Sequence, residues 1–126
     1  MVNPESLRVG NLILDSRTND LVCVGYLTSD SIGVYPKGCK GVFHPIQFNQ
    51  PYFRGIPLKE SLFRQTCLGD LEWEVYLGHS LELIKRKDSI YFRSHYQVIR
   101  KVSFLHEVQN LFYSIVGEEI KLAIDF

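Results

Sequence analysis

Residues 103–122 read SFLHEVQNLFYSIVGEEIKL and carry the clearest structural pattern in the chain. The apolar members of this stretch are Phe104, Leu105, Val108, Leu111, Phe112 and Ile115. They recur at intervals of three and four residues, which places them on one face of an α-helix. Ser103 can cap the first turn, and Gly117 can end the last turn in a left-handed conformation. The stretch therefore predicts an amphipathic helix, a glycine stop and a short terminal strand.

The overall composition limits the class of protein. The 126 residues fit one domain or two tightly packed subdomains. Three cysteines, Cys23, Cys39 and Cys67, form no C-x-x-C pair, and no apolar signal segment follows Met1, so we expect a reduced, cytoplasmic protein. The apolar runs are too short to span a bilayer, and 14 basic residues balance 14 acidic ones. Membrane insertion is therefore not expected, and net charge favours neither nucleic acid nor an anionic surface.

The first part of the chain, residues 1–50, resembles a run of short strands. Apolar or alternating segments cover residues 12–15, 21–26, 32–35 and 41–46. Turn-forming residues separate them at 17–20, 28–30 and 36–38. Four short strands at this spacing predict a small antiparallel sheet of the SH3-like barrel kind.

The second part, residues 51–126, combines helices and strands. Pro57 suits a helix start, and Leu58, Leu62 and Phe63 then share one face, which predicts a short helix ending near residue 68. Residues 72–77, 80–86 and 89–96 are expected to form three strands ahead of the helix after Ser103. The predicted fold is therefore α+β and mostly β, with an α-β-β-β-α-β order in this second subdomain.

Three short motifs resemble a family of small uncharacterised proteins from Bacteroidetes bacteria, their prophages and phages. LRVGN at residues 7–11 is similar to the family's opening turn. GIPLKE at residues 55–60, followed by Leu62 and Cys67, resembles its middle helix. VSFLHEVQNLFY at residues 102–113, followed by Gly117, Glu118 and Glu119, resembles its C-terminal hallmark. The resemblance implies a fold and a phage or mobile-element setting, and it supplies no catalytic residues.

One stretch has a marked local charge. Residues 82–101 contain six basic and two acidic residues, a net charge of +4, with aromatic side chains interleaved. The candidate surface consists of Lys85, Arg86, Lys87, Tyr91, Arg93, His95, Arg100 and Lys101. Cations that bind phosphates and rings that stack on bases would suit single-stranded nucleic acid. The same residues would also suit an acidic protein partner, or they could form an ordinary solvated hairpin.

Two further places are candidate interfaces. Tyr52 and Phe53 lie in the aromatic linker between the two parts, where they either pack or form an exposed patch. Glu107 and Asn110 lie on the predicted C-terminal helix, and Asn110 borders its apolar face, where a buried amide would need hydrogen-bond partners.

The usual constellations of catalytic and metal sites are missing from the sequence. Cys39 and His44 lack the paired spacing of structural zinc ligands, and Glu118 and Glu119 would point to opposite sides of a strand. Cys39, beside Lys40, is the most reactive thiol expected, but no partner is indicated. We therefore expect no catalytic residue, cofactor or metal.

The function that these features favour is a non-enzymatic binding or adaptor protein, monomeric or homodimeric, that acts by protein–protein contact. The family resemblance implies an accessory or host-modulating role in a phage or mobile element. A nucleic-acid-binding module is the first alternative, and a small hydrolase or nucleotide-handling enzyme is the second.

Overall fold

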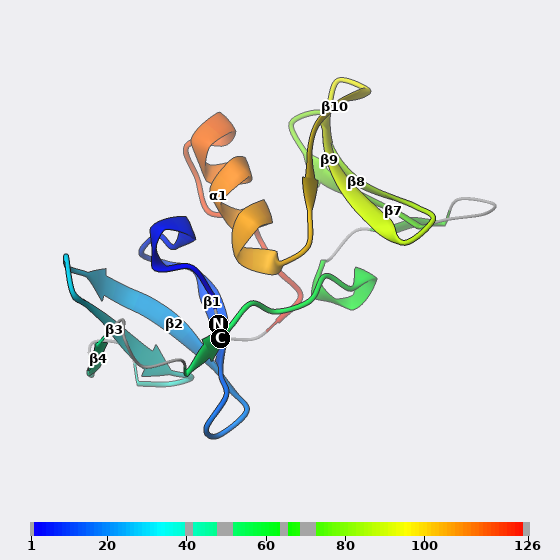
Figure 1. Cartoon of the computed structure of the whole chain (residues 1–126). Helices are drawn as coiled ribbons and strands as arrows, with labels where there is room; N and C mark the ends of the chain where they lie inside the picture. The colour runs from blue at the N-terminus through cyan, green and yellow to red at the C-terminus, as the bar shows by residue number, and fades with distance from the viewer. Residues whose placement is uncertain (1, 40–41, 48–51, 64–65, 69–72, 125–126) are drawn as a thin grey trace. The chain divides into compact units, whose positions relative to one another are not determined.

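The computed structural model describes residues 2–39, 42–47, 52–63, 66–68 and 73–124 (Figure 1). It contains two antiparallel sheets and one α-helix, which confirms an α+β, mostly β fold. The chain divides into two compact units between Ile56 and Pro57, whereas the sequence places the boundary after residue 50. The division lies later because residues 53–54 form the last strand of the first sheet.

The first unit is built on a five-stranded sheet. A 3₁₀ turn at Pro4–Ser6 precedes β1 (Leu12–Asp15), β2 (Asp20–Leu27), β3 (Ser31–Pro36), β4 (His44–Gln47) and β5 (Phe53–Arg54). The strand order is β4-β3-β2-β1-β5. The four predicted strands are therefore present, although residue 41, the predicted start of the fourth, lies outside the described residues. β5 was not predicted, since it has only two residues and pairs with β1, far away in sequence.

The core of the first unit follows the alternation of its strands. Cross-strand partners Ile13 and Val22, and then Val24 and Val34, are buried on one face. Phe53 from β5 joins this core. At the β1–β2 turn, Arg17 donates hydrogen bonds to both carboxylate oxygens of Asp15 and so lowers the pKa of that carboxyl group.

The second unit is an antiparallel meander followed by a helix. A 3₁₀ turn at Glu60–Leu62 precedes β6 (Thr66–Leu68), β7 (Trp73–Gly78), β8 (Leu81–Arg86), β9 (Ser89–Ser94), β10 (Gln97–Val102) and α1 (Leu105–Val116). The sheet order is β10-β9-β8-β7-β6. Two of its turns are two residues long with positive φ at both positions, His79 and Ser80 between β7 and β8, and His95 and Tyr96 between β9 and β10. Such turns match the right-handed twist of a hairpin.

The prediction of a helix from Pro57 to about residue 68 is wrong. Pro57 pairs with Phe104 and Phe63 pairs with Leu122 in isolated β-bridges, and Leu62 O accepts a hydrogen bond from Ala123 N at 2.8 Å. These long-range main-chain contacts are incompatible with a continuous helix, so only the 3₁₀ turn remains, and Cys67 lies in β6. The predicted terminal strand is likewise reduced to the bridge at Leu122. The predicted α-β-β-β-α-β order is therefore corrected to five strands and then one helix.

The C-terminal helix and its glycine stop are confirmed. Gly117 has φ 83° and donates its N–H to Tyr113 O at 2.8 Å. Phe104, not Ser103, is the N-cap residue, and Glu107 Oε1 accepts hydrogen bonds from both their N–H groups at 3.0 Å. The Glu107 carboxylate thus binds the two N–H groups just before the helix, as the glutamate of a capping box does.

The apolar stripe of α1 is narrower than predicted. Leu105, Val108 and Phe112 are buried, whereas Phe104 and Ile115 are exposed. His106 and Gln109 occupy the rest of the buried face. With twelve residues, α1 is far too short to cross a bilayer, and no other helix in the described part of the chain is long and apolar enough to do so.

Candidate functional site

The register of the second sheet sorts its side chains onto two faces. Val75, Leu83 and Phe92 are cross-strand neighbours and are fully buried. The adjacent set of cross-strand neighbours, one residue away from the first set on each strand, is Tyr76, Glu82 and Arg93. Val98 of β10 pairs with Arg93 and continues this row. Because successive residues in a strand point to opposite faces, these four side chains lie on the face opposite the core. We call them the outer row.

An ion pair occupies the middle of the outer row. Arg93 Nη2 lies 2.8 Å from Glu82 Oε2, and the two side chains are only 13% and 16% exposed. The Arg93 guanidinium also lies 5.4 Å from the ring centre of Tyr96. No acceptor among the described residues binds the buried Nε of Arg93. Arg93 is therefore held by a carboxylate and an aromatic ring.

Exposed apolar side chains gather beside this ion pair, at the start of β10. Tyr96 is 82% exposed, Val98 56% and Ile99 47%. A β-bulge falls between Val98 and Arg100, and Arg100 and Lys101 are exposed too. We call Tyr96, Val98, Ile99, Arg100 and Lys101 the β10 corner.

The predicted basic surface does not form one patch. Lys85 and Arg100 are in register with the residues of the buried face, whereas Tyr91, Arg93 and Lys101 point to the opposite side. Arg93 is paired with Glu82, and Arg100 Nη2 lies 3.6 Å from Glu107 Oε2. Arg93 and Arg100 are therefore both close to carboxylates.

The turn residues of this predicted surface are spread over the two ends of β9. Arg86 and Lys87 lie at the β8–β9 turn, where Lys87 has φ 57°. His95 lies at the β9–β10 turn, with Nδ1 2.9 Å from Ser94 Oγ. Residues that are close in the sequence are therefore separated in the structure, and the local charge of +4 is not concentrated in one place.

The other predicted interface residues have mainly structural contacts. The Glu107 carboxylate caps α1 and contacts Arg100, and Asn110 is half-buried. In the first unit, Phe53 is buried in the core, and half-buried Tyr52 lies under the Arg17 guanidinium at 4.4 Å. Phe48, also in the linker, lies outside the described residues.

Cysteine and histidine side chains do not converge on a reactive centre in the described part of the chain. Cys23 is buried, and a hydrogen bond with it raises the pKa of Tyr35 to about 12. Cys39 and His44 are both exposed. Across the described residues, no three His, Cys, Asp or Glu side chains are placed to hold a metal ion.

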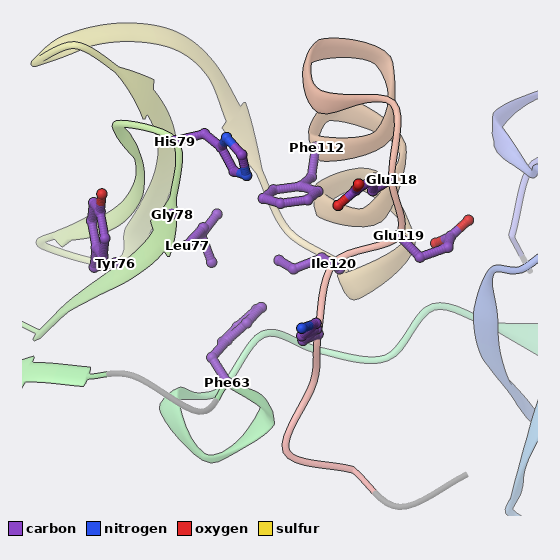
Figure 2. Close-up of a pocket in the computed structure, with 10 residues that line it drawn as sticks. Phe63, Tyr76, Leu77, Gly78, His79, Phe112, Glu118, Glu119 and Ile120 are labelled. Carbon is purple, nitrogen blue, oxygen red and sulfur yellow. The ribbon is translucent and has the colours of Figure 1, made fainter.

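The second unit also has a pocket of about 360 Å³, shown in Figure 2. Its lining residues are Phe63, Tyr76, Leu77, Gly78, His79, Phe112, Glu118, Glu119, Ile120 and Lys121. The His79 ring faces the Phe112 ring edge-on, with centroids 6.1 Å apart. The Glu119 carboxylate points away from these rings in Figure 2. The described lining contains no serine, threonine or cysteine, so it offers no nucleophile of those types.

Alternation in the sequence predicts that Glu82 and Arg93 share the face opposite the core, but sequence reasoning missed their ion pair and the pocket. The pocket joins a β-turn, α1 and the C-terminal segment, and no local motif links those three places. The Glu82–Arg93 pair follows directly from the β8–β9 register, so counting back from the Lys87-Asp88 turn could have found it.

Comparison of the chain with protein-family models, curated proteins and solved structures gives no match. The resemblance to a phage-associated family therefore stays a prediction from the three sequence motifs.

Proposed function

We propose that this chain is a non-enzymatic binding protein that acts by protein–protein contact through the β10 corner. The observation that carries the proposal is the group of three exposed apolar side chains at the edge of a sheet: Tyr96 in the turn before β10, and Val98 and Ile99 in β10 itself. Contiguous exposed apolar groups of this kind commonly mark interaction sites.

The chemistry beside these side chains supports a protein partner. Tyrosine and arginine are enriched at the energetic centres of protein interfaces. Arg93 is held in place by Glu82 and by the Tyr96 ring before any partner arrives. A side chain that is already ordered loses little conformational entropy on binding, so more of the contact energy contributes to affinity.

A nucleic-acid-binding function receives less support from the same surface. Such a function needs several free cations aligned along one face. Here Lys85 and Arg100 are separated from Lys101 by the sheet register, and Arg93 lies beside a carboxylate.

The proposal extends to the setting of the protein and to its first unit. We propose an SH3-like barrel for residues 1–56, supported by the strand order β4-β3-β2-β1-β5. We further propose a cytoplasmic accessory factor of a phage or mobile element, acting on a host protein as a monomer or homodimer. The sequence motifs at residues 7–11, 55–60 and 102–113 support this setting.

Site-specific photo-cross-linking tests the proposed function. Benzoylphenylalanine replaces Tyr96 in one variant and Tyr113, an exposed tyrosine on α1, in a matched control. In lysate of the organism that encodes the chain, we expect a discrete adduct from position 96 that excess unmodified protein suppresses. The absence of a suppressible adduct at position 96, or equal adducts from both positions, would contradict the proposal.

A further inference from the structure

We propose that β10 accepts an extended, acidic segment of a partner protein as a sixth strand of the second sheet. This inference rests on the proposed function and adds to it the mode of binding and the chemistry of the partner.

The edge of β10 is accessible along most of its length. β10 is the terminal strand of the sheet, and within the described residues no strand pairs with its second side (Figure 1). Residues 97–101 are all exposed, and only Val102 at the strand's end is buried. An edge strand with free main-chain groups is a template for an added strand.

The hairpin turn determines which main-chain groups face outward. In a two-residue hairpin, the residues that flank the turn form a hydrogen-bonded pair, here Ser94 and Gln97. The next pair, Arg93 and Val98, is then a non-hydrogen-bonded pair. The N–H and C=O of Val98 therefore point away from β9, toward the position of an incoming strand.

Many proteins protect an edge strand with a bulge and lysine side chains, and β10 has a bulge and one lysine, Lys101. The protection is incomplete, because Val98 and Ile99 remain exposed and contiguous in the middle of the strand. A partner strand that contacts these side chains would bury apolar area in addition to its main-chain hydrogen bonds.

The charge of β10 indicates that the added strand is an acidic segment of a partner and not the β10 strand of a second copy of this chain. Arg100 is close to Glu107, whereas Lys101 makes no ion pair with any described residue. Antiparallel pairing of two β10 strands would bring two copies of each cation to one shared edge, where like charges repel. A carboxylate on an incoming segment would instead neutralise Lys101.

A peptide titration followed by nuclear magnetic resonance tests this inference on the full-length chain. The probe is a capped octapeptide of four Glu-Val repeats, and the control is the matching octapeptide of four Lys-Val repeats. We expect the acidic probe to shift the amide resonances of residues 97–101, with an affinity that falls as salt rises. Equal shifts with the lysine control, no shifts on β10, or a stronger response to single-stranded oligothymidine would overturn the inference.

Two variants separate main-chain pairing from side-chain contact. Val98→Pro removes the outward N–H, and we expect loss of probe binding, whereas Val98→Thr keeps the N–H and retains it. Lys101→Glu reverses one surface charge at an exposed position. We expect it to lower the affinity for the acidic probe roughly fivefold. Unchanged binding by both Val98→Pro and Lys101→Glu would refute strand addition.

The two proposals fail in different ways. A suppressible adduct at position 96 without probe binding at β10 would refute strand addition and leave the protein-binding function standing. Probe binding at β10 without any suppressible adduct would refute the function and leave the edge as an accessible strand template.

Discussion

The Glu82–Arg93 pair gives the sharpest energetic prediction. At 2.8 Å, two unit charges attract by about 6 kcal/mol at an effective dielectric of about 20. Because both side chains are largely buried, the loss of their hydration offsets most of that attraction. The net contribution of the pair is therefore small, but the removal of one partner leaves the other charge poorly solvated. We expect Glu82→Met and Arg93→Met each to lower the free energy of unfolding by about 2 kcal/mol.

The double variant should cost no more than either single variant, because it leaves no unpaired charge. The coupling energy from the double-mutant cycle is then about 2 kcal/mol. Urea unfolding followed by Trp73 fluorescence measures it, since the chain's one tryptophan lies in β7 of the same sheet. The control cycle combines Arg100→Met with Glu107→Gln, whose ion pair is longer and more exposed, and should give about 0.5 kcal/mol or less. A similarly small coupling for Glu82 and Arg93 would refute the reasoning.

Three further predictions concern individual positions. Burial lowers the pKa of His106 in the folded chain. Below about pH 6.5 the unfolded chain therefore binds more protons than the folded one. The free energy of unfolding then falls as the pH falls, by at most about 1.4 kcal/mol per pH unit. His106→Gln should flatten this slope in urea titrations between pH 7 and 5, and an unchanged slope would exclude His106 as its source. Gly33→Ala would drive a methyl group into the Tyr26 ring, so we expect the free energy of unfolding, followed by circular dichroism, to fall by about 1–2 kcal/mol. The loss should be smaller in a Tyr26→Ala background. An equal loss in both backgrounds would exclude the clash. In Gly117→Ala the added Cβ meets open space, but the residue must keep a left-handed φ of 83°. We expect the free energy of unfolding, followed by Trp73 fluorescence, to fall by about 1 kcal/mol. No loss would mean that alanine adopts this conformation without strain.

Local sequence patterns predict the parts of this fold that local physics determines. The strands of the first sheet alternate and are bounded by turn residues, and α1 has both a helical period and a glycine stop. At Pro57 the same reasoning fails, because main-chain pairing with Phe104 outweighs the helical spacing of Leu58 and Leu62. β10 was missed for a related reason. Val98 and Ile99 are adjacent apolar residues, and Arg100 and Lys101 are adjacent cations, so no alternation marks a strand whose side chains are mostly exposed.

The candidate site was only partly predictable from the sequence. The charge of residues 82–101 and the aromatic residues among them directed attention to the hairpins that carry the outer row and the β10 corner. Alternation places Arg93 opposite the core, but no sequence pattern assigns faces to Arg100 and Lys101, because the bulge between Val98 and Arg100 changes the register of β10 against β9. It also did not indicate that Tyr96, at the turn, would be the most exposed of the large apolar side chains in the described residues.

The central claim is tested most directly by amide hydrogen exchange on the complex between this chain and the partner that cross-links at position 96. The slowing of amide exchange upon binding is compared between residues 97–102 and the residues around the His79–Phe112 pocket. Partner binding through the β10 edge predicts that exchange slows at residues 97–102, Val98 above all, and stays unchanged around the pocket. Slowing confined to the pocket, with β10 exchanging as in the free protein, would contradict the account.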